Sequence, residues 1–210
     1  MNITIVGASA GIGLETVKRG LARNHTITTL SRSEVEIEGN NALLQMRGDA
    51  TNKADVLNSI RYADALIVTL GTGKSMQPTT LFSDFAKNLV EINSQIKLDI
   101  PVVVVTGFGA GESKNFVSWP VKMFLKYFLK DVYADKTKME EILTNSGLNW
   151  TVVRPGRLFD KERTENFRIE TKLFKGMKIG GINRSDVADF LIKQAENHTE
   201  SRKYVAISEE

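Results

Sequence analysis

Short apolar runs recur along the chain, and most of them are continuous rather than alternating. VVVV at 102–105 holds no polar residue, and ALIVTL at 65–70 holds a single threonine. Continuous runs of this length are typical of parallel strands that are covered on both faces of a sheet. The pattern predicts strands at 3–6, 26–30, 43–47, 65–70, 102–106, 151–154 and 204–207.

Apolar residues at helical spacing lie between these runs. Leu14, Val17 and Leu21 mark one helix, and a similar pattern spans 82–92. The segment KTKMEEILTNSG at 136–147 predicts a further helix with Gly147 as its carboxyl-terminal stop. Because strands and helices alternate, we expect an α/β protein: a single doubly wound domain over 1–210 with a mostly parallel sheet.

Composition narrows the class of protein. The chain has 210 residues, a formal net charge of +3 and no cysteine. Thiol chemistry is therefore excluded, and the charge is too small for a dedicated nucleic-acid binder. The longest apolar runs are about one strand long, which predicts no membrane span, and the sequence shows no signal-peptide pattern. We expect a cytoplasmic protein, a monomer or weak homodimer, that binds neither nucleic acid nor membrane.

A glycine-rich turn, GASAGIG, follows the first predicted strand and precedes the first helix. In such a unit the first glycine allows a sharp turn, the second lets the backbone approach a diphosphate, and the third lets the helix pack closely. The turn predicts a Rossmann-like, NAD(P)-binding domain. The expected cofactor contacts are Gly7, Ala8, Ser9, Gly11, Ile12 and Gly13. The alternative is a turn that is needed only for packing.

An arginine follows the second predicted strand where many dinucleotide-binding domains carry an acid. An acid there binds the 2′-hydroxyl of the adenosine ribose, whereas an arginine accommodates a 2′-phosphate. Arg32 lies between Ser31 and Ser33, whose hydroxyl groups can also donate. These three residues favour NADPH over NADH; the alternative is an ordinary surface arginine.

Further polar and glycine-rich motifs follow the third and fourth predicted strands. RGDA at 47–50 places Asp49, with Ala50, where its carboxylate can accept from the adenine amino group. TLGTG at 69–73 places Leu70, Gly71 and Thr72 beside the cofactor. Ligands of open α/β sheets lie at the carboxyl ends of strands, so these motifs support the same site.

Four longer segments resemble the atypical short-chain dehydrogenase/reductase family, and among its members the biliverdin-IXβ/flavin reductase type. The resemblance implies an NADPH-dependent reductase whose substrate pocket is formed by loops near 107–130 and 155–182. It places Thr106 near the nicotinamide ribose, and Pro155, Gly156, Arg157 and Leu158 around the nicotinamide and the acceptor. The segments are DALIVTLGTGKSMQPTT at 64–80, TGFGAGES at 106–113, SGLNWTVVRPGRL at 146–158 and NRSDVADFLI at 183–192.

Two positions depart from the family pattern. Most short-chain dehydrogenases use Tyr-x-x-x-Lys, in which the lysine lowers the tyrosine pKa for proton exchange. Lys136 has the right spacing, but Val132 holds the tyrosine position, and Tyr133 is one residue off, roughly 100° away on a helix. Gly107 replaces the serine of the biliverdin/flavin reductases. We therefore expect no tyrosine-driven alcohol dehydrogenase.

Hydride transfer to a flavin or similar planar acceptor needs mainly correct positioning, because the acceptor stabilises its own charge. Lys136 and Arg157 are the candidates for polarising or binding an anionic acceptor; each is equally a solvated cation. A non-catalytic NADP(H) sensor is a second hypothesis, and a sugar-nucleotide epimerase-like enzyme a third. We expect no metal, since His25 and His198 lack a ligand constellation.

The segment NFVSWPVKMFLKYFLKDVY at 115–133 is rich in aromatic residues. Aromatic side chains stack on planar rings, so this segment can roof a flat acceptor. Burial of an amphipathic helix that begins near Pro120 is the commoner explanation for such a pattern.

Overall fold

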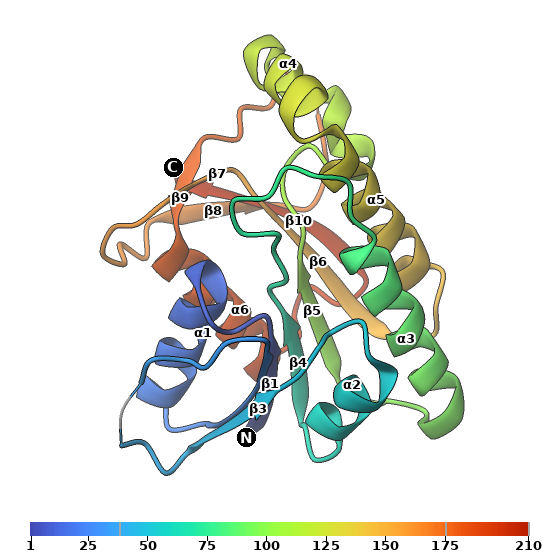
Figure 1. Ribbon diagram of the computed structural model, residues 1–210. Helices are drawn as coiled ribbons and strands as arrows, with labels where there is room; N and C mark the ends of the chain where they lie inside the picture. Colours follow the sequence, from blue (N-terminus) through green and yellow to red (C-terminus); the bar gives the residue numbers. More distant parts are fainter. Residues whose placement is uncertain (38, 175, 210) are drawn as a thin grey trace.

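The main sheet of the computed structural model, which describes residues 1–37, 39–174 and 176–209, has the strand order β3-β2-β1-β4-β5-β6-β10-β8 (Figure 1). All neighbouring pairs are parallel except β10 and β8. The strands are β1 (Asn2–Val6), β2 (Thr26–Ser31), β3 (Leu43–Arg47), β4 (Ala65–Val68), β5 (Pro101–Val105), β6 (Asn149–Pro155), β8 (Phe167–Glu170) and β10 (Lys203–Glu209).

The direction of strand addition reverses at β1. The chain moves outward from β1 to β2 and β3, and then crosses back to place β4 on the other side of β1. In open α/β sheets the ligand crevice lies at the carboxyl ends of the strands, at this reversal. The glycine turn leaves the carboxyl end of β1 and therefore lies at the expected crevice.

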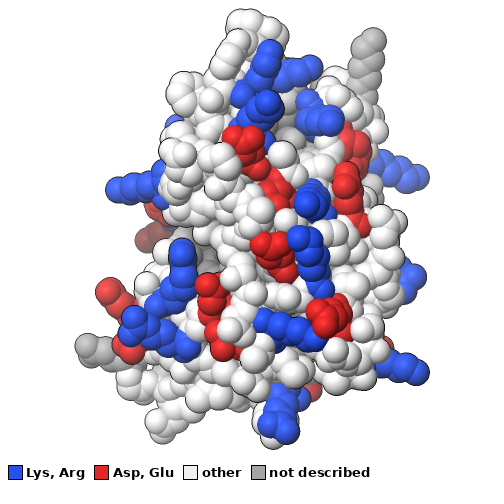
Figure 2. Space-filling view, turned by 45° about the vertical axis from the view of Figure 1, so that its right-hand side comes forward, with Lys and Arg blue, Asp and Glu red and all other residues white. Residues whose placement is uncertain are grey.

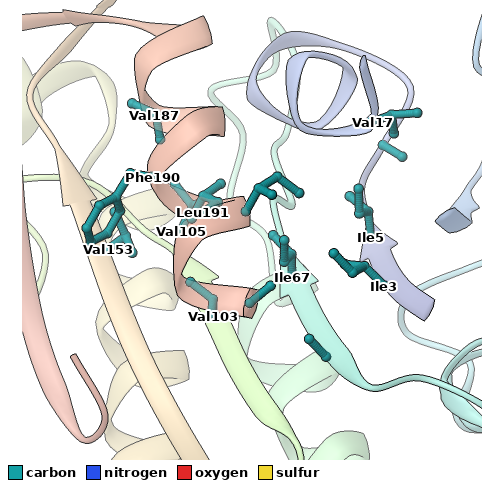
Figure 3. Packing of buried hydrophobic residues seen from close by; sticks show 14 of the residues in the cluster. Ile3, Ile5, Val17, Ile67, Val103, Val105, Val153, Val187, Phe190 and Leu191 are labelled. Carbon is teal, nitrogen blue, oxygen red and sulfur yellow. The ribbon is translucent and has the colours of Figure 1, made fainter. Parts of the chain in front are cut away.

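Helices cover both faces of the sheet (Figure 1). One layer buries Val17 and Leu191 against Ile5 and other strand residues (Figure 3), and the other buries Phe85 and Met139. The first layer consists of α1 (Gly11–Ala22) and α6 (Arg184–Glu196), and the second of α2 (Lys53–Ile60), α3 (Leu81–Ile96) and α5 (Lys130–Thr144). The single α/β domain with a Rossmann-like sheet is thus confirmed.

Two excursions extend beyond the carboxyl ends of β5 and β6 (Figure 1). The first contains the short helix η1 (Gly111–Asn115) and α4 (Trp119–Phe128). The second contains β7 (Arg157–Phe159) and β9 (Gly181–Asn183), which pair as a small parallel sheet. Acidic and basic side chains are interspersed on the face of α3 and α5 in Figure 2, whereas α4 at its top shows mainly uncharged and lysine surface.

Several predicted boundaries differ from the observed ones. β4 ends at Val68 rather than at 70, and the Thr69 hydroxyl that follows donates to the carbonyl oxygen of Gly7 at 3.1 Å. The helix predicted from 136 begins at Lys130 and ends at Thr144, so Gly147 lies in the following turn and does not stop it. β7, β8 and β9 were not predicted, because they are short and carry no apolar run. No helix in the described part of the chain combines the length and the apolar character needed to cross a membrane.

Candidate functional site

The glycine turn packs tightly against the chain that follows β4. A Cβ atom on Gly13 would lie 2.1 Å from the carbonyl oxygen of Gly7 and 2.7 Å from the Thr69 hydroxyl. Such a contact has no room for any side chain. A Cβ atom on Gly7 would likewise lie 2.8 Å from the carbonyl oxygen of Thr69. Both glycines are therefore needed for packing, whether or not a cofactor binds.

Gly11 has a different environment. It is exposed and has a positive φ of 57°, and a Cβ atom at this position would have only the Arg184 side chain within 4 Å. It is also the first residue of α1, and the N-cap Ala10 gives the amides of the first turn no side-chain acceptor among the described residues. Uncapped amides at a helix start bind anions well, since the helix dipole adds to their hydrogen bonds. Side-chain packing does not account for this glycine, but its positive φ does, and the exposed turn leaves amides that could hold an anion such as a diphosphate.

The carboxyl ends of β2 and β3 bring Arg32 and Asp49 into one region. Arg32 is exposed, while the Ser31 hydroxyl donates to the carbonyl oxygen of Ser33 at 2.8 Å and is thus engaged within the turn. Hydrogen bonds from the backbone and hydroxyl of Thr51, together with the charge of Arg32, lower the pKa of Asp49. The positive charge of Arg32 therefore acts on the Asp49 carboxylate, and the exposed Arg32 side chain is accessible to a ligand.

The turn after β4 completes this part of the edge. Leu70 is partly buried in the core layer of α3, and Gly71 is exposed with open space around it. The Thr72 hydroxyl donates to the carbonyl of Ser75 at 2.8 Å. Ala50 is buried in the core beneath α2 and α3. The structure therefore places the predicted cofactor residues of β1 to β4 along one edge of the sheet.

A buried polar network lies at the carboxyl end of β5. The Thr106 hydroxyl donates to Oε1 of Glu140 at 2.6 Å, and Glu140 also accepts from Nε and Nη2 of Arg154 at 3.0 and 2.7 Å. Burial opposes the charged form of Arg154, but hydrogen bonds to Glu140 and Glu112 outweigh it and raise its pKa. Arg154 also stacks on the Tyr204 ring at 4.1 Å. This network holds Thr106 rigidly at the predicted nicotinamide end.

Lys136 belongs to the same cluster. Its Nζ donates to the carbonyl oxygen of Thr106 at 2.6 Å and lies 5.3 Å from the ring centroids of both Phe82 and Tyr133. Burial lowers the pKa of Lys136 to about 8, and the charge of Glu140 limits the shift. The candidate lysine therefore lies at the site edge and is not a solvated surface cation.

The lowered pKa of Lys136 predicts a pH-dependent stability. Below pH 8 the group is charged in both states and its burial cost is fully present. Between about pH 8 and 10.5 the folded state releases the proton first, so the free energy of unfolding rises with pH. Lys136→Met is expected to be more stable than wild type at pH 7, by about 1–3 kcal/mol, with the difference shrinking towards pH 10. Urea unfolding at both pH values measures this; parallel profiles would contradict it.

Tyr133, not residue 132, faces the site. Val132 is buried in the core of the α3 and α5 layer. Successive residues of a helix point about 100° apart, so Tyr133 points in a different direction from Val132. The Tyr133 hydroxyl lies 2.9 Å from the position of a Cβ on Gly107, and Gly107 has a φ of 148° that side chains rarely adopt. The phenol of Tyr133, a residue that the sequence pattern places one position off, therefore lies beside Gly107 at the end of β5.

The residues predicted to surround the nicotinamide, at the end of β6 and just after it, have different environments. Pro155 is buried, and its carbonyl accepts from the backbone of Phe108 at 2.9 Å. A Cβ on Gly156 would lie 1.9 Å from the carbonyl of Gly180, so this glycine is needed for packing against the β9 segment. Leu158 packs against the core on β7.

Arg157 is not brought to Lys136. It is exposed at the start of β7, and its guanidinium lies 5.3 Å from the centroid of the Phe159 ring. This geometry supports a solvated cation rather than a group at the reacting atoms. A role for Arg157 in holding an anionic acceptor stays a prediction.

The aromatic residues of α4 are exposed rather than buried. Trp119, Tyr127 and Phe128 have 73%, 67% and 54% of their surface accessible, and Phe124 stacks on Phe128 at 5.4 Å. The interpretation of this helix as core packing is therefore wrong. Between the predicted pocket loops lies a cavity of about 250 Å³, lined in part by Glu112, Leu173 and Tyr204. Lys175, which falls within the second loop, lies outside the described residues.

Among the described residues, His, Cys, Asp and Glu side chains form no group of three or more that could hold a metal ion. Tyr133 and Glu140 are the site residues that sequence reasoning missed. The sequence held a weak indication of Glu140, which lies three residues before the apolar Leu143 and so on the same helix face. A charged residue on an apolar helix face is usually buried with a partner, as Glu140 is.

The fold and the glycine turn together define a Rossmann-type NAD(P)-binding protein. The sequence profile of the NAD(P)H-binding family matches residues 7–198, so the chain belongs to that family. Among curated proteins it is similar to the uncharacterized sugar epimerase YhfK of Bacillus subtilis (strain 168), with 27% identity over 97% of this chain and 92% of the relative.

Solved structures of the same shape include two reductases. ChuY from Escherichia coli O157:H7, described as an anaerobillin reductase, has a TM-score of 0.79 and 20% identity, over 100% of this chain and 97% of its own. A putative NADH-flavin reductase from Streptococcus pneumoniae TIGR4 has a TM-score of 0.78 and 20% identity, over the whole of both chains. At this identity the likeness establishes the fold.

Proposed function

We propose that the protein is an NADPH-dependent reductase that delivers hydride to a flavin or a similar planar acceptor. The observation that carries the proposal is the alignment of the uncapped glycine turn, Arg32 and the Thr106–Lys136 pair along one sheet edge. When bound, NADPH supplies the hydride. The chain's own residues bind the cofactor, orient it and shape the space above it.

Each part of this edge suits one part of the cofactor. The amides that follow Gly11 receive the diphosphate, and the Arg32 guanidinium receives the 2′-phosphate, which it can bind bidentately. Lys136 and Thr106 lie at the nicotinamide end. Burial raises the pKa of Tyr133, so its hydroxyl stays protonated through neutral pH and can donate a hydrogen bond to the acceptor.

A planar acceptor fits the surroundings of that end. The exposed aromatic rings of α4, above all Trp119, can stack on a flat ring system. Lys122 and Lys126 add positive charge to the same helix for a phosphate- or carboxylate-bearing acceptor. The solved structures of similar shape include one described as an anaerobillin reductase and one described as a putative NADH-flavin reductase, which supports this class of substrate.

The proposal is tested by following the absorbance of NADPH at 340 nm with flavins, quinones and tetrapyrroles. We expect consumption of NADPH with at least one planar acceptor and no consumption with simple aldehydes. With NADP+ and secondary alcohols, the reverse direction, we expect no formation of NADPH. Tight NADPH binding without turnover on any acceptor would instead identify a cofactor sensor.

Replacing Arg32 with alanine is expected to weaken NADPH about 10- to 100-fold and to leave NADH nearly unchanged. The reason is that a charge-assisted hydrogen bond to the 2′-phosphate contributes about 1.5–3 kcal/mol. Calorimetric titration of both cofactors measures the effect, with Arg61→Ala as a control for loss of an exposed arginine away from the site. Equal affinities of the wild type for NADPH and NADH would contradict the assignment.

A sugar-nucleotide epimerase-like activity is the second candidate. The 27%-identical relative is described as a sugar epimerase, and Tyr133 restores a phenol close to Lys136. An epimerase of this kind takes a hydride from its substrate onto the bound oxidised cofactor and then returns it, so that no cofactor is consumed. Conversion of a nucleotide sugar without net NADPH loss would favour this candidate over the reductase.

A further inference from the structure

The glycine turn has a cationic neighbour that comes from the opposite end of the chain. Nε and Cδ of Arg184 lie 3.6 and 3.8 Å from the position of a Cβ on Gly11. Arg184 is the first residue of α6, and α6 packs beside α1 on the same face of the sheet (Figure 1). A guanidinium therefore borders the helix start at which a diphosphate is expected.

The backbone of Arg184 is held in place from both sides. The preceding Asn183 is paired with Phe159 in the β7–β9 sheet, and its side-chain amide Nδ2 donates to Oδ2 of Asp186 at 3.1 Å. The fully buried Asp186 carboxylate also accepts from the backbone amides of Thr164 and Glu165 at 2.9 and 2.8 Å. The side chain of Arg184 thus extends from a rigid point, which lowers the entropy lost on ligand binding.

The partner that Arg184 now has can be exchanged. Nη1 of Arg184 donates to Oδ1 of Asp160 at 2.7 Å, but the Asp160 side chain is 83% exposed while that of Arg184 is 25% exposed. An ion pair with so exposed a carboxylate contributes little. Beside the pair is a surface cleft of about 680 Å³ that includes Lys18 and Lys161, so the guanidinium has room to turn.

We propose that Arg184 is a ligand of the dinucleotide diphosphate, exchanging the Asp160 carboxylate for phosphate oxygens when the cofactor binds. The inference rests on the proposed function, since the ligand is the nicotinamide dinucleotide. The first turn of α1, GIGL, supplies amides but no charged side chain, and the diphosphate carries two negative charges. Arg184 supplies a compensating positive charge at that position, as Arg32 does at the 2′-phosphate.

The experiment compares NADPH with adenosine 2′-monophosphate, which has the adenosine end but no diphosphate. Arg184→Ala is expected to weaken NADPH by about tenfold or more and to leave adenosine 2′-monophosphate within about twofold of wild type. Arg32→Ala is expected to weaken both. Asp160→Ala, which removes the competing carboxylate and leaves the guanidinium, is expected to bind NADPH at least as tightly as wild type.

Each other outcome overturns the inference in a recognisable way. Unchanged NADPH affinity in Arg184→Ala removes the diphosphate role. Equal weakening of both ligands, or weakening of NADPH by Asp160→Ala, would show that the Arg184–Asp160 pair only maintains the loop. If the wild type binds no nicotinamide dinucleotide at all, the proposed function itself is wrong. If the wild type binds NADPH and Arg184→Ala binds it equally well, only the role of Arg184 is wrong.

Discussion

Glu140→Ala is expected to lower the free energy of unfolding by about 3–5 kcal/mol, because it leaves the buried Arg154 guanidinium without its main partner. The Arg154 side chain is 1% exposed and that of Glu140 is 2% exposed. The substitution also removes the acceptor of the Thr106 hydroxyl. Urea unfolding monitored by tryptophan fluorescence measures the loss.

Glu112→Ala is the matched control for this prediction. Glu112 binds the same guanidinium at 2.8 Å, but its side chain is 52% exposed. Its removal leaves the Glu140–Arg154 pair intact and is expected to cost about 1 kcal/mol or less. Equal losses for the two variants would show that burial does not decide the strength of this network.

Gly13→Ala is expected to reduce NADPH affinity by about 100-fold or more. The new methyl group would lie 2.1 Å from the backbone oxygen of Gly7, and backbone cannot move aside as a flexible side chain can. The glycine turn must therefore open, and its amides leave the diphosphate position. Fluorescence titration with NADPH checks the affinity, and circular dichroism checks that the variant remains folded.

Gly147→Ala serves as the comparison. Its Cβ would meet only the side-chain amide of Asn93 at 3.8 Å, and its φ lies outside the left-handed region. We expect unchanged stability and unchanged NADPH affinity. A Gly13→Ala protein that binds NADPH as wild type does would contradict the geometry assigned to the turn.

The sequence alone predicts those parts of the molecule in which a local pattern of residues also determines the place in the sheet. Continuous apolar runs gave the parallel strands, since burial on both faces leaves no polar position. The motifs at Gly7, Arg32 and Thr106 all follow such runs, so they could be assigned to one edge before their contacts were known. Short strands such as β8 escaped prediction because four half-buried residues leave no clear pattern.

The site details that were missed depend on helix phase and on distant segments. A shift of one residue on α5 decides whether Val132 or Tyr133 faces Gly107, and the spacing to Lys136 does not reveal this phase. Periodicity in α4 predicted an apolar face but not that this face would lack a covering element. The approach of Arg184 to Gly11 arises from the packing of α6 beside α1, which no local pattern encodes.

The central claim is that the turn after β1 holds the diphosphate of a nicotinamide dinucleotide. A crystal structure of the protein grown with saturating NADPH tests it most directly. We expect density for the diphosphate within hydrogen-bond distance of the amides that follow Gly11, with the 2′-phosphate at Arg32. A dinucleotide bound elsewhere, or a crevice at β1 and β4 that stays empty under these conditions, would contradict the account.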